Sequence, residues 1–159
     1  MVAHLEELRA QLAAALDWRD AHAGFDAVVA DLPVGLRGRV PEGLPYSPWQ
    51  LVEHLRLAQA DILDFCRNPE YEEQTWPDDY WPKAPAPPSP GAWDESIAGF
   101  RRDREALQDL ARDGSVDLFA RIPHGTGQTY LRELLLVLDH TAYHVGQLIV
   151  VRRLLGAWE

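Results

Sequence analysis

The chain has a single cysteine, Cys66, among its 159 residues. One thiol excludes an intrachain disulfide framework and a zinc finger built on cysteines. The chain also contains no run of 18 apolar residues, and its first ten residues are amphipathic and acidic. We therefore expect neither a membrane span nor a signal peptide, and we expect a cytoplasmic protein.

Basic residues are in the minority. The chain has 15 lysines and arginines against 25 aspartates and glutamates, which gives a formal net charge of −10. An acidic surface of this kind repels phosphate backbones, so we expect no nucleic-acid partner. Apolar residues, in contrast, make up 47% of the chain and include six tryptophans. At this length and composition we expect a single domain over residues 1–159, with a core large enough to be stable without disulfides.

Apolar residues recur with helical spacing in four segments, which predicts helices over residues 2–31, 48–67, 92–112 and 129–155. Pro33 ends the first segment, and Gly156 closes the last one. The second segment begins with the strongest local signal. Ser47 fits the N-cap, Pro48 the first helical position and Gln50 the third, which together form a capping box with the favoured proline.

The connection between the second and third predicted helices is long and rich in proline. Seven of the twelve prolines fall within residues 68–90, together with Tyr71, Trp76, Tyr80 and Trp81. A flexible linker would be poor in aromatic residues, so we predict an ordered crossover laid against the bundle, with its tryptophans placed to cover a ligand pocket. Four helices with one long middle connection predict an all-α four-helix bundle that is not simply up-down-up-down.

Three histidines interrupt the apolar stripes of two predicted helices. His140 and His144 lie one turn apart on the same face as Val137. His54 occupies a core-facing position of the helix over residues 48–67. The spacing His-x-x-x-His lets two imidazoles converge on one ion, and the third histidine can reach the same ion if the two stripes face each other.

Burying an imidazole without a partner costs about 1–3 kcal/mol, and one divalent metal would offset that cost for all three. Three neutral imidazoles suit zinc, nickel, copper or iron, of which we expect zinc or nickel. They leave a coordination position open, which is typical of catalytic rather than structural sites. Because a free imidazole titrates near pH 6.5, we expect metal affinity to fall on acidification through roughly pH 6–7.

Three functions fit this pattern of histidines. The leading hypothesis is a small metalloenzyme, in which an activated thiol attacks an electrophilic carbon or an activated water hydrolyses an ester or amide. The alternative is a non-enzymatic metal-binding or ligand-binding stress-response protein. The third is a purely structural bundle whose histidines bond to aspartate or glutamate, and it predicts no metal. The sequence identifies no separate catalytic base.

Other polar residues are expected to be structural. Asp61 lies on the same stripe as the first histidine, and we expect it to form an ion pair within the bundle rather than support a metal ligand. Gln147 is expected to bond across helices rather than face a pocket. His124 is predicted to be a turn residue within residues 117–128, a short hairpin or an irregular turn. Cys66 has no base near it in the sequence, so we expect a buried apolar residue and not a nucleophile.

Two parts of the sequence resemble the DinB/YfiT-like superfamily. The C-terminal signature of that family is similar to Asp-His-Thr-Ala-Tyr-His-Val-Gly-Gln-Leu at residues 139–148, followed by Arg-Arg-Leu-Leu-Gly at residues 152–156. Its motif in the second helix is similar to Trp-Gln-Leu-Val-Glu-His-Leu at residues 49–55. The order and separation of these elements agree with the family over nearly the whole chain.

The resemblance implies an up-down-down-up bundle that holds one divalent metal with three histidines, here His54, His140 and His144. It also implies a homodimer. The better understood relatives are thiol-dependent transferases and isomerases, including mycothiol-dependent maleylpyruvate isomerase and bacillithiol transferases. Those relatives often contain additional parts that this chain does not match. A small-molecule substrate or thiol is therefore expected, but its identity does not transfer.

Overall fold

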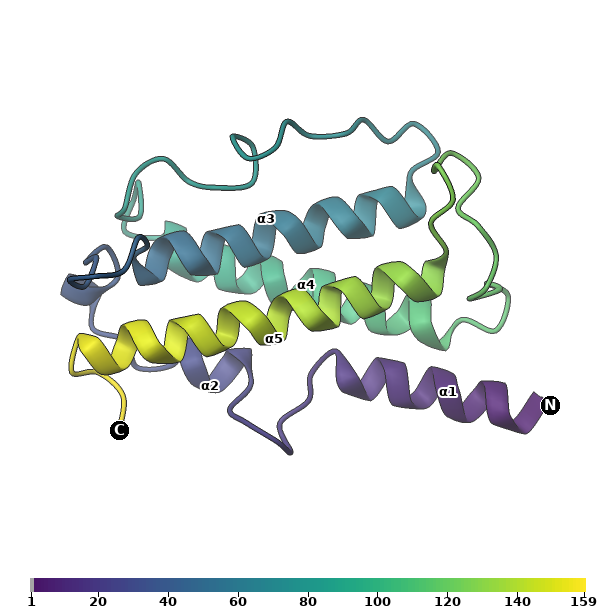
Figure 1. The fold of residues 1–159 in the computed structure, drawn as a ribbon, viewed down its shortest axis with the longest axis horizontal. Coiled ribbons are helices and arrows are strands. Elements are labelled where there is room, and N and C mark those ends of the chain that lie inside the picture. The colour runs from purple at the N-terminus through teal and green to yellow at the C-terminus, as the bar shows by residue number, and fades with distance from the viewer. Residues whose placement is uncertain (1) are drawn as a thin grey trace.

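The computed structural model describes residues 2–159, which form helices and loops without a strand. The helices are α1 (Val2–Ala15), α2 (Phe25–Val29), the 3-10 helix η1 (Val34–Leu36), α3 (Pro48–Arg67), α4 (Ala92–Arg112) and α5 (Tyr130–Leu154). Along the bundle α3 and α4 run in one direction, and α1 and α5 run in the other (Figure 1). The prediction of an all-α fold is confirmed.

The single long helix predicted over residues 2–31 is wrong. The chain leaves α1, turns through residues 16–24 and forms only the short α2. The polar residues of this turn offer no apolar stripe to bury, so the helix is not continued through them. Arg104 of α4 instead donates hydrogen bonds to Asp17 before α2 and to Asp26 within it. This buried guanidinium joins the two sides of the break.

The three longer helices begin and end close to the predicted residues. At the start of α3 the Ser47 hydroxyl accepts a bond from the Gln50 backbone N–H, and the Gln50 side chain accepts one from the Ser47 N–H, both at 3.1 Å. The capping box is therefore confirmed, and it fixes where α3 enters the bundle. Gly156 has a φ of 71°, the left-handed conformation that ends α5.

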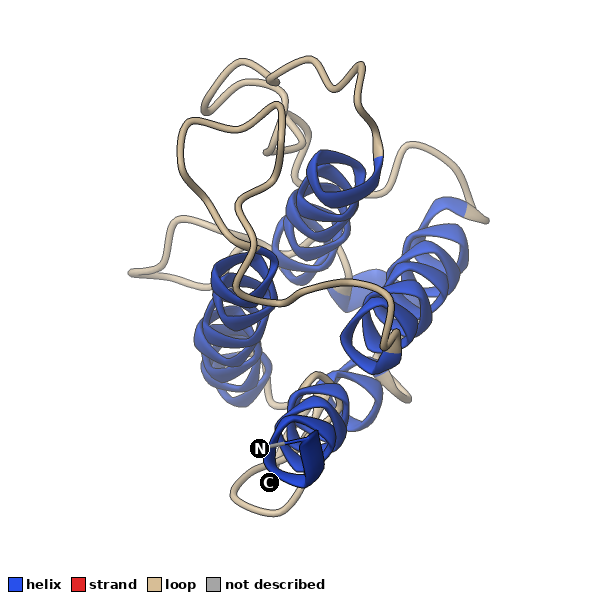
Figure 2. Ribbon diagram, turned by 90° about the vertical axis from the view of Figure 1, so that its right-hand side faces the viewer, coloured by secondary structure: helices blue, strands red, loops and turns tan. Residues whose placement is uncertain are grey.

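The main core cluster lies between α2, α3, α4 and α5, and a second cluster lies between α1, α4 and α5. The helix α3 is central to the first because it packs against both α4 and α5. The largest fully buried side chains include Trp93 and Phe100 of α4, Leu55 of α3 and Leu148 of α5. Figure 2, which looks along the bundle, shows the helices arranged around this common interior. The inner faces of α3 and α5 are thus held in contact over several turns.

The crossover between α3 and α4 lies along α3, as Figure 1 shows in teal. Two of its prolines are hydrogen-bonded to the start of α3, where the side chains of Ser47 and Gln50 donate to the backbone carbonyls of Pro85 and Pro82, respectively. The connection between α4 and α5 is an irregular turn with one isolated bridge between Arg121 and Thr129 rather than a hairpin of two strands.

By length and composition alone, α5 is apolar enough to cross a membrane. A single helix of this kind is weak evidence, because core helices of bundles meet the same criterion. The inner face of α5 packs against α3 and contains two of the three histidines. Its outer face is exposed and apolar at Leu135, Tyr143, Val150 and Leu154.

Candidate metal centre

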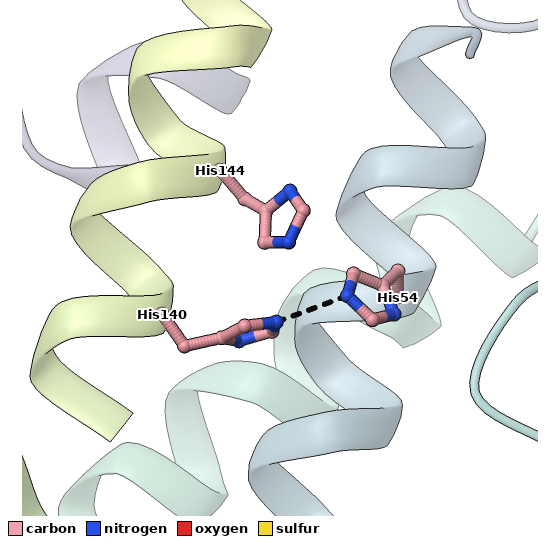
Figure 3. Close-up of side chains that lie close together, drawn as sticks. All are labelled: His54, His140 and His144. Atoms are coloured by element: carbon pink, nitrogen blue, oxygen red, sulfur yellow. Dashed lines mark hydrogen bonds between the residues drawn. The ribbon is translucent and has the colours of Figure 1, made fainter. Parts of the chain in front are cut away.

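The structure brings the three predicted histidines together at the contact between α3 and α5. His54 projects from α3 toward His140 and His144, which project from successive turns of α5 (Figure 3). No two of their ligand nitrogens are more than 4.8 Å apart. The Nε2 atoms of His54 and His140 are 3.0 Å apart. Among residues 2–159 this is the group of histidine, cysteine and carboxylate side chains that could hold a metal ion.

The spacing of these nitrogens fits a divalent ion. Two imidazole nitrogens that each lie about 2.0–2.1 Å from zinc are separated by about 2.9 Å at a right angle and about 3.4 Å at a tetrahedral angle. The separation of 3.0 Å between His54 and His140 falls inside this interval. This pair of donors therefore matches the separation that a metal requires, and the third donor lies within 4.8 Å of both.

Hydrogen bonds on the far side of two rings orient their lone pairs toward the cluster. His54 Nδ1 donates to the backbone carbonyl of Tyr80 at 2.8 Å, and a carbonyl can only accept. His144 Nδ1 lies 2.7 Å from the side-chain oxygen of Gln147 and donates to it. Each neutral ring then has an unprotonated Nε2, the atom that would bind a metal. The expectation that Gln147 bonds across helices is wrong, because it bonds to a histidine of its own helix.

Burial keeps the imidazoles uncharged. His54 is 1% exposed and His144 is 6% exposed. Burial, together with repulsion between the rings, lowers the pKa of His54 and of His140 to about 4, and burial also lowers the pKa of His144. All three are therefore neutral at pH 7. We expected metal affinity to fall on acidification through the pH range in which a free imidazole titrates. That range is too high, because the lowered pKa values keep the histidines of the folded protein unprotonated to lower pH.

The arrangement differs from the structural alternative, in which the histidines bond to aspartate or glutamate. Within residues 2–159 the rings bond to one another, to a backbone carbonyl and to an amide oxygen, and none of them bonds to a carboxylate. The nearest carboxylate on the stripe, Asp61, accepts bonds from the hydroxyls of Tyr71 at 3.0 Å and Tyr80 at 2.7 Å. The expected ion pair of Asp61 is therefore wrong.

Aromatic rings of the crossover cover the cluster. Trp81 stacks on His54 with ring centroids 3.7 Å apart and an angle of 8° between the planes. Tyr46 in turn stacks on Trp81, with ring centroids 4.2 Å apart. Trp76 meets His54 only edge-on at 6.5 Å and is 68% exposed. Of the two tryptophans expected to cover a pocket, Trp81 lies directly on His54, a candidate metal ligand, and Trp76 lies further out.

Two cavities lie beside the cluster. The first has a volume of about 330 Å³, is mainly apolar, and is lined by Gln147 and Tyr143, which both contact His144. The second has a volume of about 420 Å³ and is more polar. Asp61 and Tyr80 form part of its wall, and His124 lines it from the irregular turn. The walls of both cavities consist of residues other than the three histidines, and the cavities adjoin the cluster through wall residues that contact its rings: Gln147, Tyr143 and Tyr80.

The remaining sulfur lies outside this arrangement. Cys66 is buried near the end of α3, and burial raises the pKa of its thiol to about 12. The expectation of a buried residue is confirmed. The sequence did not single out Gln147 as a partner of His144, or Tyr80 as a partner of His54. A glutamine three residues after a histidine on one helix is a weak signal, whereas a backbone carbonyl in a loop leaves no signal at all.

Comparison with known families agrees with this geometry. The model of the DinB superfamily matches residues 17–148, which is well over half of the chain and includes all three histidines. The chain belongs to the DinB superfamily. No curated protein and no solved structure matches the chain. Membership in the DinB superfamily and the cluster of three histidines are both compatible with metal binding.

Proposed function

We propose that this DinB-superfamily protein is a divalent-metal-dependent enzyme whose ion, zinc or nickel, is held by His54, His140 and His144. The convergence of three neutral imidazoles that lack carboxylate partners, two of them buried and one half-buried, supports this proposal most strongly. A bound divalent ion would supply Lewis acidity, which lowers the pKa of a water or thiol into the neutral range. Three protein ligands leave room for such a molecule.

The chain's own residues prepare the site in three ways. The Tyr80 carbonyl and the Gln147 amide hold two rings with their lone pairs facing inward. Trp81 covers the outer face of His54 and excludes water from it. The two cavities would hold a substrate against residues that contact the histidines, Gln147 and Tyr143 in the first cavity and Tyr80 in the second. Binding and orientation, rather than proton transfer by a separate base, are the roles that these residues support.

The reacting thiol in this proposal comes from a small molecule. The single thiol of the chain is buried, and its raised pKa keeps it protonated at neutral pH. We therefore propose, as the leading reaction, that a small-molecule thiol attacks an electrophilic carbon of the substrate, which leads to group transfer or isomerisation. Hydrolysis is the second candidate, since water could occupy the same open position. A non-enzymatic metal-binding protein would be expected to supply a fourth ligand, and the group found within residues 2–159 has three.

Activity can be tested with paired electrophiles. Untagged, zinc-loaded protein is mixed with N-acetylcysteine and 1-chloro-2,4-dinitrobenzene, and in a second arm with 4-nitrophenyl acetate alone. We expect a saturable rate in the thiol arm that is lost in His140→Ala. A saturable rate only in the ester arm would identify a hydrolase. Metal binding with rates equal to those of His140→Ala in both arms would overturn the enzymatic proposal and favour the non-enzymatic alternative.

We also propose that the protein forms a homodimer through the outer face of α5. Exposed apolar residues recur along that face at Leu135, Tyr143, Val150 and Leu154, with the exposed Asp139 between the first two. An apolar stripe of this length is typical of a contact with another protein surface.

Light scattering should give about twice the chain mass of 18.0 kDa. Leu154→Glu should halve it, while Phe119→Glu, which changes an exposed apolar residue away from the stripe, should not. A monomer at micromolar concentration would contradict the proposal.

A further inference from the structure

Tyr80 connects two residues of α3 that are two turns apart. Its backbone carbonyl accepts the bond from His54 Nδ1 at 2.8 Å, and its hydroxyl donates to Asp61 Oδ2 at 2.7 Å. Asp61 follows His54 by seven residues, which is about 10 Å along a helix. The length of one tyrosine therefore spans the interval between the histidine and the carboxylate. Asp61 never touches the histidine, but it fixes the residue that does.

The bond between Tyr80 and Asp61 is a strong anchor for the crossover. Burial and the bond to Asp61 raise the pKa of Tyr80, so its hydroxyl stays protonated and remains a donor. A hydrogen bond from a neutral hydroxyl to a carboxylate is charge-assisted and is roughly twice as strong as one between neutral groups. Tyr71 donates to the other oxygen of Asp61 at 3.0 Å. Both bonds tie the crossover to α3, and only Tyr80 also contacts His54.

The position of the Tyr80 carbonyl determines which nitrogen of His54 is free. When the carbonyl accepts from Nδ1, the proton is held there and Nε2 has its lone pair toward His140. Without that acceptor the ring is free to rotate or to take the other tautomer, in which Nε2 is protonated and cannot bind a metal. Partners of this kind typically change metal affinity by 10–100-fold.

We propose that Asp61 is a positioning residue for the metal centre, which it serves by anchoring Tyr80 so that the Tyr80 carbonyl holds His54 in its metal-binding tautomer. The proposal rests on the proposed metal site, but it makes a separate statement about the metal-free protein. There, too, the proton of His54 is on Nδ1. Among residues 2–159, Asp61 thus forms no ion pair and does not contact a metal ligand. It acts on His54 through Tyr80, which belongs to the crossover between α3 and α4.

The structure provides a matched pair of variants. Tyr80→Phe and Tyr71→Phe each remove one oxygen, and each removes one hydrogen bond to Asp61. Only the first loosens the residue whose carbonyl contacts His54. If Asp61 and its tyrosines merely stabilised the fold, the two variants would affect the metal centre alike. Asp61→Asn keeps an acceptor oxygen for Tyr80 and should rescue most of what Asp61→Ala loses.

Two measurements test the proposal. In metal-free protein, side-chain nitrogen-15 spectra of histidine should show Nδ1 of His54 protonated in the wild type and in Tyr71→Phe, and a mixture of tautomers in Tyr80→Phe. Competition with a zinc chelator should show a loss of affinity of about 10–100-fold in Tyr80→Phe, and a change of less than about threefold in Tyr71→Phe. Circular dichroism verifies that each variant is folded.

The possible results separate this proposal from the metal site itself. Equal changes in Tyr80→Phe and Tyr71→Phe, or an unchanged His54 tautomer in Tyr80→Phe, would overturn the positioning role even if zinc binds tightly. If the wild type binds no zinc or nickel, the proposed function fails, and the tautomer measurement still decides whether Asp61 orients His54. Should Asp61→Ala fail to fold, the two phenylalanine variants give the answer by themselves.

Discussion

His140→Ala is expected to abolish tight metal binding. His140 lies within 3.0 Å of His54 and is one of only three candidate ligands in the described residues. Loss of a residue that merely orients a ligand typically costs 10–100-fold in affinity, so loss of a ligand should cost more than about 100-fold. Competition with a chromogenic chelator for zinc and for nickel measures this loss directly.

The matched control for this prediction is His4→Ala. His4 is exposed on α1 and lies outside the cluster, so its loss should leave the affinity unchanged. Similar affinities in His140→Ala and the wild type would mean that the metal binds elsewhere, and the three-histidine site would be wrong. Equal losses in both variants would show that the assay measures nonspecific binding to histidine.

The metal-free protein is expected to lose stability as the pH falls from about 6.5 toward 4. Burial lowers the pKa of His54 and of His140 to about 4 in the folded protein, whereas a histidine in the unfolded chain titrates near 6.5. Between these values the unfolded chain binds more protons than the folded protein, so acid favours unfolding. Above pH 7 the rings are neutral in both states and contribute no slope.

Urea unfolding in the presence of a chelator tests this pH dependence. The midpoint should fall between pH 7 and pH 5 in the wild type, and it should fall less in a variant with His54→Leu and His140→Leu, which has lost both titrating groups. Other titrating residues are common to both proteins, so the difference between the two slopes isolates the histidines. Parallel slopes would show that the rings do not resist protonation and would contradict their burial as neutral ligands.

Local signals in the sequence predicted most of the fold. The capping box at Ser47 and the glycine at 156 set the ends of α3 and α5, because both act through neighbouring residues. The first helix could not be bounded in this way. Arg104, which is about 80 residues distant in the sequence, bonds to Asp17 and Asp26 and so holds the two sides of the break together. A contact of that kind has no local pattern.

The candidate site was predictable to the same extent. The histidines were found because each replaces an apolar residue on a core-facing stripe, and that pattern is visible in the sequence. Their supporting contacts were not found. The bond from His54 to Tyr80 depends on the path of the crossover and on a backbone carbonyl, which every residue has. The expected ion pair of Asp61 failed for the same reason, since its partners are hydroxyls supplied by that crossover.

The most direct test of the metal centre is a crystal structure of untagged protein grown with zinc near pH 7.5, with diffraction recorded on both sides of the zinc absorption edge. We predict one anomalous peak between α3 and α5, about 2.0–2.2 Å from nitrogens of His54, His140 and His144. A peak at any other place, or imidazoles that point apart in the presence of zinc, would contradict the account.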